Sequence, residues 1–65
     1  MNKRAFRAKM IYNGDTYESI AEALNISVGS VGNKVNGRFP FTQDEIATLK
    51  ERWNLTPQEV DEIFL

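Results

Sequence analysis

Two short helix signals separated by one tight turn occupy residues 16–38, and this stretch constrains the fold more than any other. Thr16 can cap a first helix, in which Ile20 and Leu24 lie four residues apart on one face. Ala21 is small enough to let a second helix approach closely at the inner corner. Two helices this short bury little surface by themselves, so they need the rest of the chain as a scaffold.

The second helix signal follows directly after the first. Asn25 tolerates the left-handed backbone that is needed to leave the first helix, and Ser27 can cap the next one. Val31 and Val35 give this second helix a stripe of apolar residues, and Gly37 ends it. The pattern therefore predicts a helix-turn-helix.

Two capping boxes predict further helices in the second half of the chain. Thr42 and Glu45 form the first box, and the apolar side chains that follow it at spacings of three and four are Ile46, Leu49 and Trp53. Thr56 and Glu59 form the second box, with Pro57 at the first helical position and an apolar stripe of Val60, Ile63 and Phe64. Because Trp53 shares a face with Leu49, we assign its ring to the core rather than to stacking on bases.

The first helix of the chain is predicted over residues 3–13, where Phe6 and Met10 face inward and Asn13-Gly14 ends the helix. Ile11 and Tyr12 are expected to widen its apolar side, with the Tyr12 hydroxyl in water. The sequence therefore predicts five helices in one all-α bundle.

The segment Arg38-Phe39-Pro40-Phe41 is predicted to be a loop, because Pro40 disfavours helix at the preceding residue. Both phenylalanines are expected to plug the core. Contact with a partner surface is the alternative for Phe39.

Four motifs in residues 16–38 also carry a family resemblance: Ser19-Ile20-Ala21, Leu24-Asn25-Ile26-Ser27, Ser30-Val31-Gly32 and Val35-Asn36-Gly37. With these motifs the chain resembles lambda-repressor-like and phage Cro-like regulators, whose DNA-binding domain has the length and element order of nearly the whole chain. The resemblance implies a compact five-helix domain over residues 1–65 that binds operator DNA and regulates transcription. It also implies a place in the cytoplasm of a bacterial host cell, at the nucleoid.

In a helix-turn-helix the second helix lies in the major groove, with its N-terminal residues at the base edges. Mapped onto this chain, the base-reading residues are Val28, Gly29, Ser30, Gly32 and Asn33. The Asn33 amide can offer a donor and an acceptor to adenine, and Val28 could contact a thymine methyl group. The family usually has polar residues at the positions of Val28 and Gly29, so this chain departs from it there.

Gly29 and Gly32 each weaken a helix by roughly 0.5–1 kcal/mol relative to alanine. Two explanations stay open at this point. The backbone approaches DNA closely, or Val31 and Val35 hold a short helix that merely tolerates the glycines.

Six residues are expected to contact DNA phosphates: Lys3, Arg4, Arg7, Tyr17, Lys34 and Arg38. Tyr17 is included on the resemblance alone, because the family usually has a phosphate-contacting glutamine at that position. Plain solvation is the alternative for isolated surface cations.

The charge of the chain is distributed unevenly. Residues 1–38 contain six basic and three acidic side chains, a net charge of plus 3, and residues 39–65 contain two basic and six acidic side chains, a net charge of minus 4. A basic half that contains the helix-turn-helix suits a one-sided phosphate contact. Favourable placement of acids at helix N-termini is the alternative for the acidic half.

The composition excludes several classes of site. The chain has no cysteine and no histidine, which rules out disulfides, cysteine zinc sites and cysteine or histidine nucleophiles. No apolar run approaches the roughly 18 residues of a membrane span. The carboxylates are spaced as caps and solvated faces, so we expect no enzyme, no metal and no cofactor.

One domain of this kind spans a single operator half-site, so we expect a symmetric dimer or a cooperatively bound pair on DNA. Phe64 and Leu65 are the expected dimer contacts, unless Phe64 closes the core and Leu65 frays. An interaction module that modulates a phage repressor by binding it is the alternative function, because Val28, Gly29 and Val31 make a weakly polar face.

Overall fold

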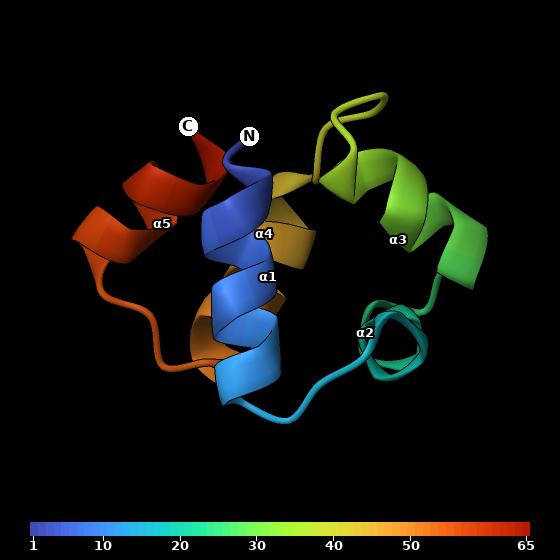
Figure 1. Ribbon diagram of the computed structural model, residues 1–65, viewed down its shortest axis with the longest axis horizontal. Helices are drawn as coiled ribbons and strands as arrows, with labels where there is room; N and C mark the ends of the chain where they lie inside the picture. The colour runs from blue at the N-terminus through green and yellow to red at the C-terminus, as the bar shows by residue number, and fades with distance from the viewer.

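The computed structural model describes residues 1–65 as five α-helices without strands, which confirms the predicted all-α class. In chain order the helices are α1 (Lys3–Tyr12), α2 (Tyr17–Leu24), α3 (Val28–Val35), α4 (Gln43–Arg52) and α5 (Pro57–Phe64). In Figure 1, α1 lies in front of α4, with α5 on one side and α2 and α3 on the other. The radius of gyration of 10.4 Å is close to the roughly 11 Å expected for a compact chain of this length.

Every helix begins at a residue whose side chain accepts a hydrogen bond from a backbone N–H three residues on. These N-caps are Asn2, Thr16, Ser27, Thr42 and Thr56. Glu45 and Glu59 return the hydrogen bond to the cap residue's N–H, which confirms both predicted capping boxes. Ser19 does the same for α2, a third box that the sequence pattern did not reveal.

The core is a single cluster of apolar side chains around Phe6, which has no exposed surface. The Phe6 ring stacks on Phe41 at a centroid distance of 5.4 Å and meets Trp53 edge-on at 5.1 Å. The predicted core positions of Phe41 and Trp53 are thereby confirmed. Leu55, which follows α4, is buried as well.

Three apolar side chains that were predicted to lie in or at the edge of the core are on the surface. Ile11, Tyr12 and Phe39 are 67%, 84% and 59% exposed. The inward face of α1 is narrow: only Phe6 and Met10 are buried, and helical geometry turns Ile11 and Tyr12 away from that face into solvent. The loop between α3 and α4 turns Phe41 inward and leaves Phe39 outside.

A buried carboxylate fixes the start of α2 against α4. Asp15 accepts two hydrogen bonds from the Arg52 guanidinium, at 2.9 and 2.8 Å, one from Trp53 Nε1 at 2.7 Å and one from the Ser19 hydroxyl at 2.8 Å. The bonds from Arg52 contribute most to a pKa of Asp15 that lies well below its usual range, even though burial raises it. This network holds α2, and with it α3, in a fixed position on the rest of the molecule.

The connection between α2 and α3 is the tight turn Asn25-Ile26-Ser27. Asn25 adopts the predicted left-handed conformation with φ of 57°, and the Ile26 N–H donates to the carbonyl of Ala21 at 3.0 Å. In Figure 1, α2 is seen end-on and α3 lies across the view, so the two helices cross steeply. The turn thus directs the N-terminus of α3 away from the bundle.

Candidate nucleic-acid interface

The helix α3 has one face in the core and one in solvent. Val31 and Val35 are completely or almost completely buried, as predicted. Gly29, Gly32 and Asn36 lie three and four residues apart on the other side, with Asn33 next to Gly32. We call these four residues, with the exposed Val28 at their edge, the α3 face.

Neither glycine of the α3 face is required by packing within the chain. A Cβ atom at Gly32 would have no neighbour within 4 Å, and one at Gly29 would meet only the Ser27 hydroxyl at an ordinary 3.9 Å. The helix therefore carries two destabilising residues that its own scaffold does not need. Tolerance of the glycines and close approach of an external surface are the two explanations that remain.

The polar side chains of α3 differ in how far they are already engaged. Ser27 is the N-cap, as predicted: its Oγ accepts from the Ser30 N–H at 3.1 Å, and its hydroxyl donates to Ser30 Oγ at 2.9 Å. The Asn33 side-chain amide is half-buried and makes no hydrogen bond within the chain. Of the expected base readers, Asn33 is therefore the one with both its donor and its acceptor free.

Cations from two other segments border the α3 face. Lys3 Nζ donates to Asn36 Oδ1 at 2.7 Å, which brings the start of α1 to the end of α3. Arg7 lies one turn after Lys3 on the same side of α1 and forms no ion pair. Arg38 follows α3 directly, and its backbone N–H donates to the Asn33 carbonyl at 2.9 Å while its side chain is exposed.

Arg4 lies elsewhere on α1. It borders a different surface hollow, beside Glu62 and Leu65. Helical geometry turns it about a quarter of a revolution away from Lys3. The structure thus places Lys3 and Arg38 beside the C-terminal end of the α3 face, with Arg7 one turn further along α1 from Lys3 and Arg4 turned away from it.

Lys34 does not have the free ammonium group that its expected phosphate contact needs. Its side chain is only 14% exposed, and Nζ lies 2.7 Å from Glu45 Oε1 and 3.2 Å from the Pro40 carbonyl. Although burial raises the pKa of Glu45, the hydrogen bonds from Lys34 and Thr42 outweigh it and lower that pKa. Lys34 therefore links α3 to α4, and we leave it out of the interface.

Tyr17 is also poorly placed for its expected phosphate contact. It is the first residue of α2 and is half-buried, with its ring packed on the core. Its hydroxyl makes no hydrogen bond within the chain. Tyr17 thus supports the scaffold, and only its hydroxyl remains for an outside group.

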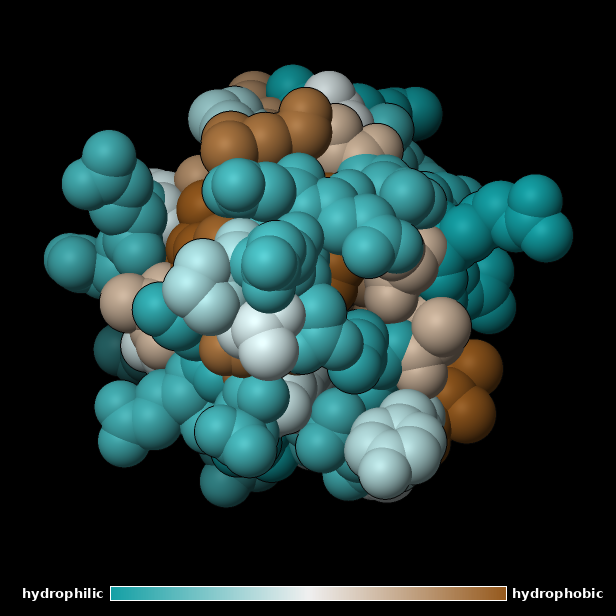
Figure 2. Space-filling view, turned by 90° about the vertical axis from the view of Figure 1, so that its left-hand side faces the viewer, coloured by the Kyte–Doolittle hydropathy of each residue, from teal (hydrophilic) through white to brown (hydrophobic).

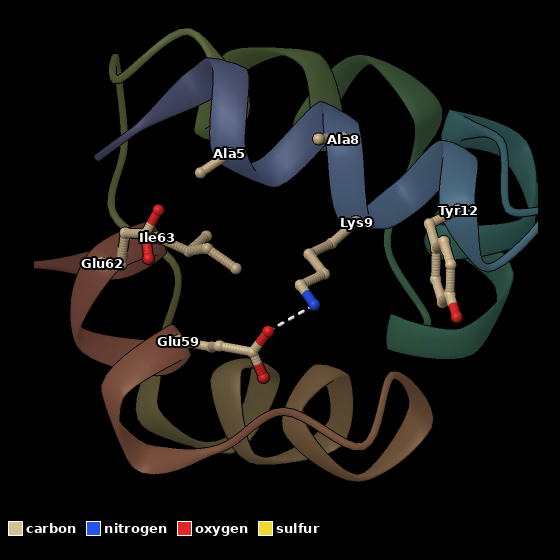
Figure 3. Close-up of a pocket in the computed structure, with 7 residues that line it drawn as sticks. All are labelled: Ala5, Ala8, Lys9, Tyr12, Glu59, Glu62 and Ile63. Carbon is tan, nitrogen blue, oxygen red and sulfur yellow. Dashed lines mark ion pairs between the residues drawn. The ribbon is translucent and has the colours of Figure 1, made fainter.

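A separate cleft of about 350 Å³ lies between α1 and α5, on the side of α1 away from α3 (Figure 3). Its lining includes Ala5, Ala8, Ile63 and the exposed Tyr12, and an ion pair between Lys9 and Glu59 crosses it. The hydrogen bond from Lys9 is the main cause of a lowered pKa of Glu59. The cleft thus has one ion pair across it.

The structure contains no group of three or more acidic, histidine or cysteine side chains placed to hold a metal ion. None of its helices is both long and apolar enough to cross a membrane.

The sequence analysis did not include Asn36 among the residues of the α3 face. Asn36 is seven residues after Gly29, a spacing that puts both on the same side of the helix.

The α3 face thus combines the free Asn33 amide with cations beside its C-terminal end. Comparisons of the chain with protein-family models, with curated proteins and with solved structures found no match.

Proposed function

We propose that this chain is a helix-turn-helix regulator of the Cro-like kind, which binds double-stranded DNA with α3 in the major groove. The observation that carries the proposal is that Lys3 and Arg38 lie beside an outward face that contains the free Asn33 amide, with Arg7 one turn further along α1. Cations from two segments, α1 and the residues directly after α3, can contact phosphates beside the groove that α3 occupies.

The overall net charge of minus 1 is compatible with this function because the charges are separated. The acids of α5 are on the opposite side of α1 from α3 in Figure 1. Exposed charges separated by more than a Debye length, about 8 Å at physiological salt, are largely screened from one another. The DNA therefore meets the basic border rather than the average charge of the molecule.

The chemistry of the α3 face favours modest sequence discrimination. It offers one amide for a base edge, the apolar Val28 for a thymine methyl group and the bare backbone of two glycines. Most of the affinity then comes from the phosphates. Three neutralised phosphates give a slope of log affinity against log salt of roughly −3.

The test is fluorescence anisotropy on a duplex selected from a random pool and on a scrambled duplex, each over a range of salt concentrations. Arg38→Ala is expected to weaken binding to both duplexes about equally and to reduce the magnitude of the slope by roughly 1. Lys50→Ala removes the same charge from an exposed site on the side of α4 away from Glu45 and Arg52, so its slope should match the wild type.

Two results would refute the proposal. One is the absence of salt-sensitive binding to any duplex, and the other is an equal change of slope in Arg38→Ala and Lys50→Ala.

Binding of a repressor protein is the second candidate function. The observation that favours it is that the α3 face contains no charged side chain of its own and has small residues at Gly29 and Gly32, as a close protein contact would need. Co-purification with a phage repressor, together with no shift of operator DNA, would select this candidate over the first.

A further inference from the structure

Two asparagines of this chain are each followed by a glycine, the dipeptide that most favours loss of a side-chain amide. They are Asn13 before Gly14 and Asn36 before Gly37, and both asparagines are exposed. Glycine has no side chain to obstruct its backbone nitrogen, and its backbone is flexible. That nitrogen can therefore reach the asparagine Cγ and displace ammonia.

The reaction consumes water and needs no enzyme. The glycine nitrogen loses its proton and forms a bond to the asparagine Cγ, which closes a cyclic succinimide. The bond from Cγ to the side-chain nitrogen breaks, and that nitrogen takes up a proton and leaves as ammonia. Water then opens the ring at either of its carbonyl carbons. The products are aspartate and isoaspartate, each with a carboxylate in place of the amide.

The backbone has nearly the same conformation at the two sites. Asn13 is the C-cap of α1, with φ of −89° and ψ of 3°, and Asn36 is the C-cap of α3, with φ of −78° and ψ of 0°. The N–H groups of Gly14 and Gly37 each donate to a carbonyl three residues earlier, at 3.0 and 3.1 Å. Each glycine nitrogen is therefore released only when the end of its helix opens locally.

The side-chain partners, in contrast, differ between the two sites. Asn13 Nδ2 donates to the Lys9 carbonyl at 2.7 Å, which holds the amide against its own helix. Asn36 Oδ1 instead accepts from Lys3 Nζ at 2.7 Å, and its Nδ2 makes no hydrogen bond within the chain. As the glycine nitrogen attacks, negative charge develops on Oδ1, and an ammonium group beside that oxygen stabilises it. The nitrogen that must leave is thus bound at Asn13 and free at Asn36.

We propose that Asn36 is a site of spontaneous deamidation activated by Lys3, and that the resulting carboxylate lowers the affinity of the α3 face for DNA. The second part rests on the proposed DNA binding. The new negative charge lies beside Lys3 and offsets a cation that is expected to contact phosphate. The affinity for DNA therefore falls as the protein ages.

The change at Asn36 leaves the core of the molecule intact. Asn36 is exposed, and the core is closed elsewhere, where the Phe64 ring meets Phe41 edge-on at a centroid distance of 5.5 Å and Phe6 at 6.2 Å. Phe64 is thus a core residue rather than the expected dimer contact, and Leu65 is 89% exposed. On the α5 side of the molecule, apolar areas are small and separated by hydrophilic side chains (Figure 2). The new charge therefore acts on its neighbours at the end of α3 and the start of α1.

Peptide-mapping mass spectrometry of the intact chain, sampled during incubation at neutral pH, tests the modification. Asn36 is expected to convert about tenfold faster than Asn13. Lys3→Ala should slow the conversion about tenfold, less than the roughly 100–1,000-fold of a buried oxyanion donor, because water screens the exposed Lys3. Isoaspartate among the products identifies the succinimide route.

Arg4→Ala is the matched control for Lys3→Ala. It removes the same charge from the same turn of α1, on a side that is turned away from α3. The rate of conversion at Asn36 should therefore be unchanged in this variant.

Fluorescence anisotropy on the selected duplex tests the effect on DNA. Asn36→Asp should reduce the magnitude of the salt slope by about 1, as the loss of one phosphate-contacting cation would. Asn13→Asp is the matched control, because it adds the same charge roughly 15 Å along α1 from Lys3, which is more than a Debye length. It should bind like the wild type.

The proposal is overturned if Asn13 converts as fast as Asn36, if Lys3→Ala does not slow the conversion, or if Asn36→Asp binds DNA like the wild type. The last result would leave the proposed function in place, because the wild type still binds. Failure of the wild type to bind any duplex would instead refute the proposed function and the second part of the proposal, while the mass spectra would still decide on the modification.

Discussion

Alanine at Gly29 and Gly32 should stabilise the free protein and weaken its binding to DNA. Both glycines have helical backbone conformations, since neither is among the residues with positive φ. Because the space that a Cβ atom would occupy at each position is open, the added methyl groups meet no obstacle within the chain. Each substitution should raise the free energy of unfolding by about 0.5–1 kcal/mol.

The double variant therefore gains about 1–2 kcal/mol, a large increase for a domain whose total stability is expected to be about 3–5 kcal/mol. At roughly 4–8 °C per kcal/mol, its melting temperature should rise by about 4–16 °C. On DNA the two methyl groups occupy the space between α3 and the groove. Holding Asn33 away from its base edge should cost the roughly 1–3 kcal/mol that a good base contact supplies.

Urea unfolding followed by the fluorescence of the single tryptophan, Trp53, measures the stability, and anisotropy on the selected duplex measures the binding. Gly14→Ala is the matched control, because the space around Gly14 is also open but its φ is +72°. The same methyl group should there destabilise the protein, by about 1 kcal/mol.

The stability measurement and the binding measurement test different parts of this prediction. A double variant that is more stable and binds DNA like the wild type would remove the α3 face from the interface. A double variant that is less stable would refute the conclusion that α3 has room for two methyl groups.

Two further predictions concern Asn33 and Asp15. Asn33→Ala should cost about 1–3 kcal/mol of discrimination at one base position, and unchanged relative affinities for selected and scrambled duplexes would remove Asn33 from base reading. Asp15→Asn should lower the free energy of unfolding at pH 7 by about 2 kcal/mol, because Trp53 Nε1 and Arg52 lose a charged acceptor. The pKa of Asp15 is lower in the folded protein than in the unfolded chain, so the stabilisation from the ionised carboxylate is complete above the unfolded pKa of about 4. It disappears as the pH falls toward the folded-state pKa. Urea unfolding curves of wild type and Asp15→Asn should therefore differ at pH 7 and converge in acid.

Local chemistry was sufficient to predict where the helices begin. An N-cap hydroxyl accepts a hydrogen bond from the backbone N–H three residues later, which is an interaction within one helical turn. Four helix starts could therefore be predicted without knowledge of the fold, at Thr16, Ser27, Thr42 and Thr56. Only the end of the first helix differs slightly, since α1 stops at Tyr12 and Asn13 is its C-cap.

Contacts between distant residues were not predictable in the same way. Asp15 and Arg52 are 37 positions apart, and neither residue type nor spacing indicates that they meet. The same holds for Lys34, whose pairing with Glu45 engages a cation that its position in the predicted helix-turn-helix assigned to DNA phosphate. The periodicity of α1 marked Phe6 as inward, but it could not show that no helix would cover Ile11.

The link from Lys34 to Glu45 has a consequence for the motion of α3. It ties the second half of α3 to α4, whereas the first half has the Ser27 cap and the buried Val31 and contains Gly29. Helix segments with few buried contacts open locally at low free energy, and their amide hydrogens exchange early. We therefore expect the backbone amide hydrogens of the first turn of α3 to exchange fastest within that helix. A ligand that orders this turn reduces the conformational entropy of the protein, and its new contacts must offset part of that loss.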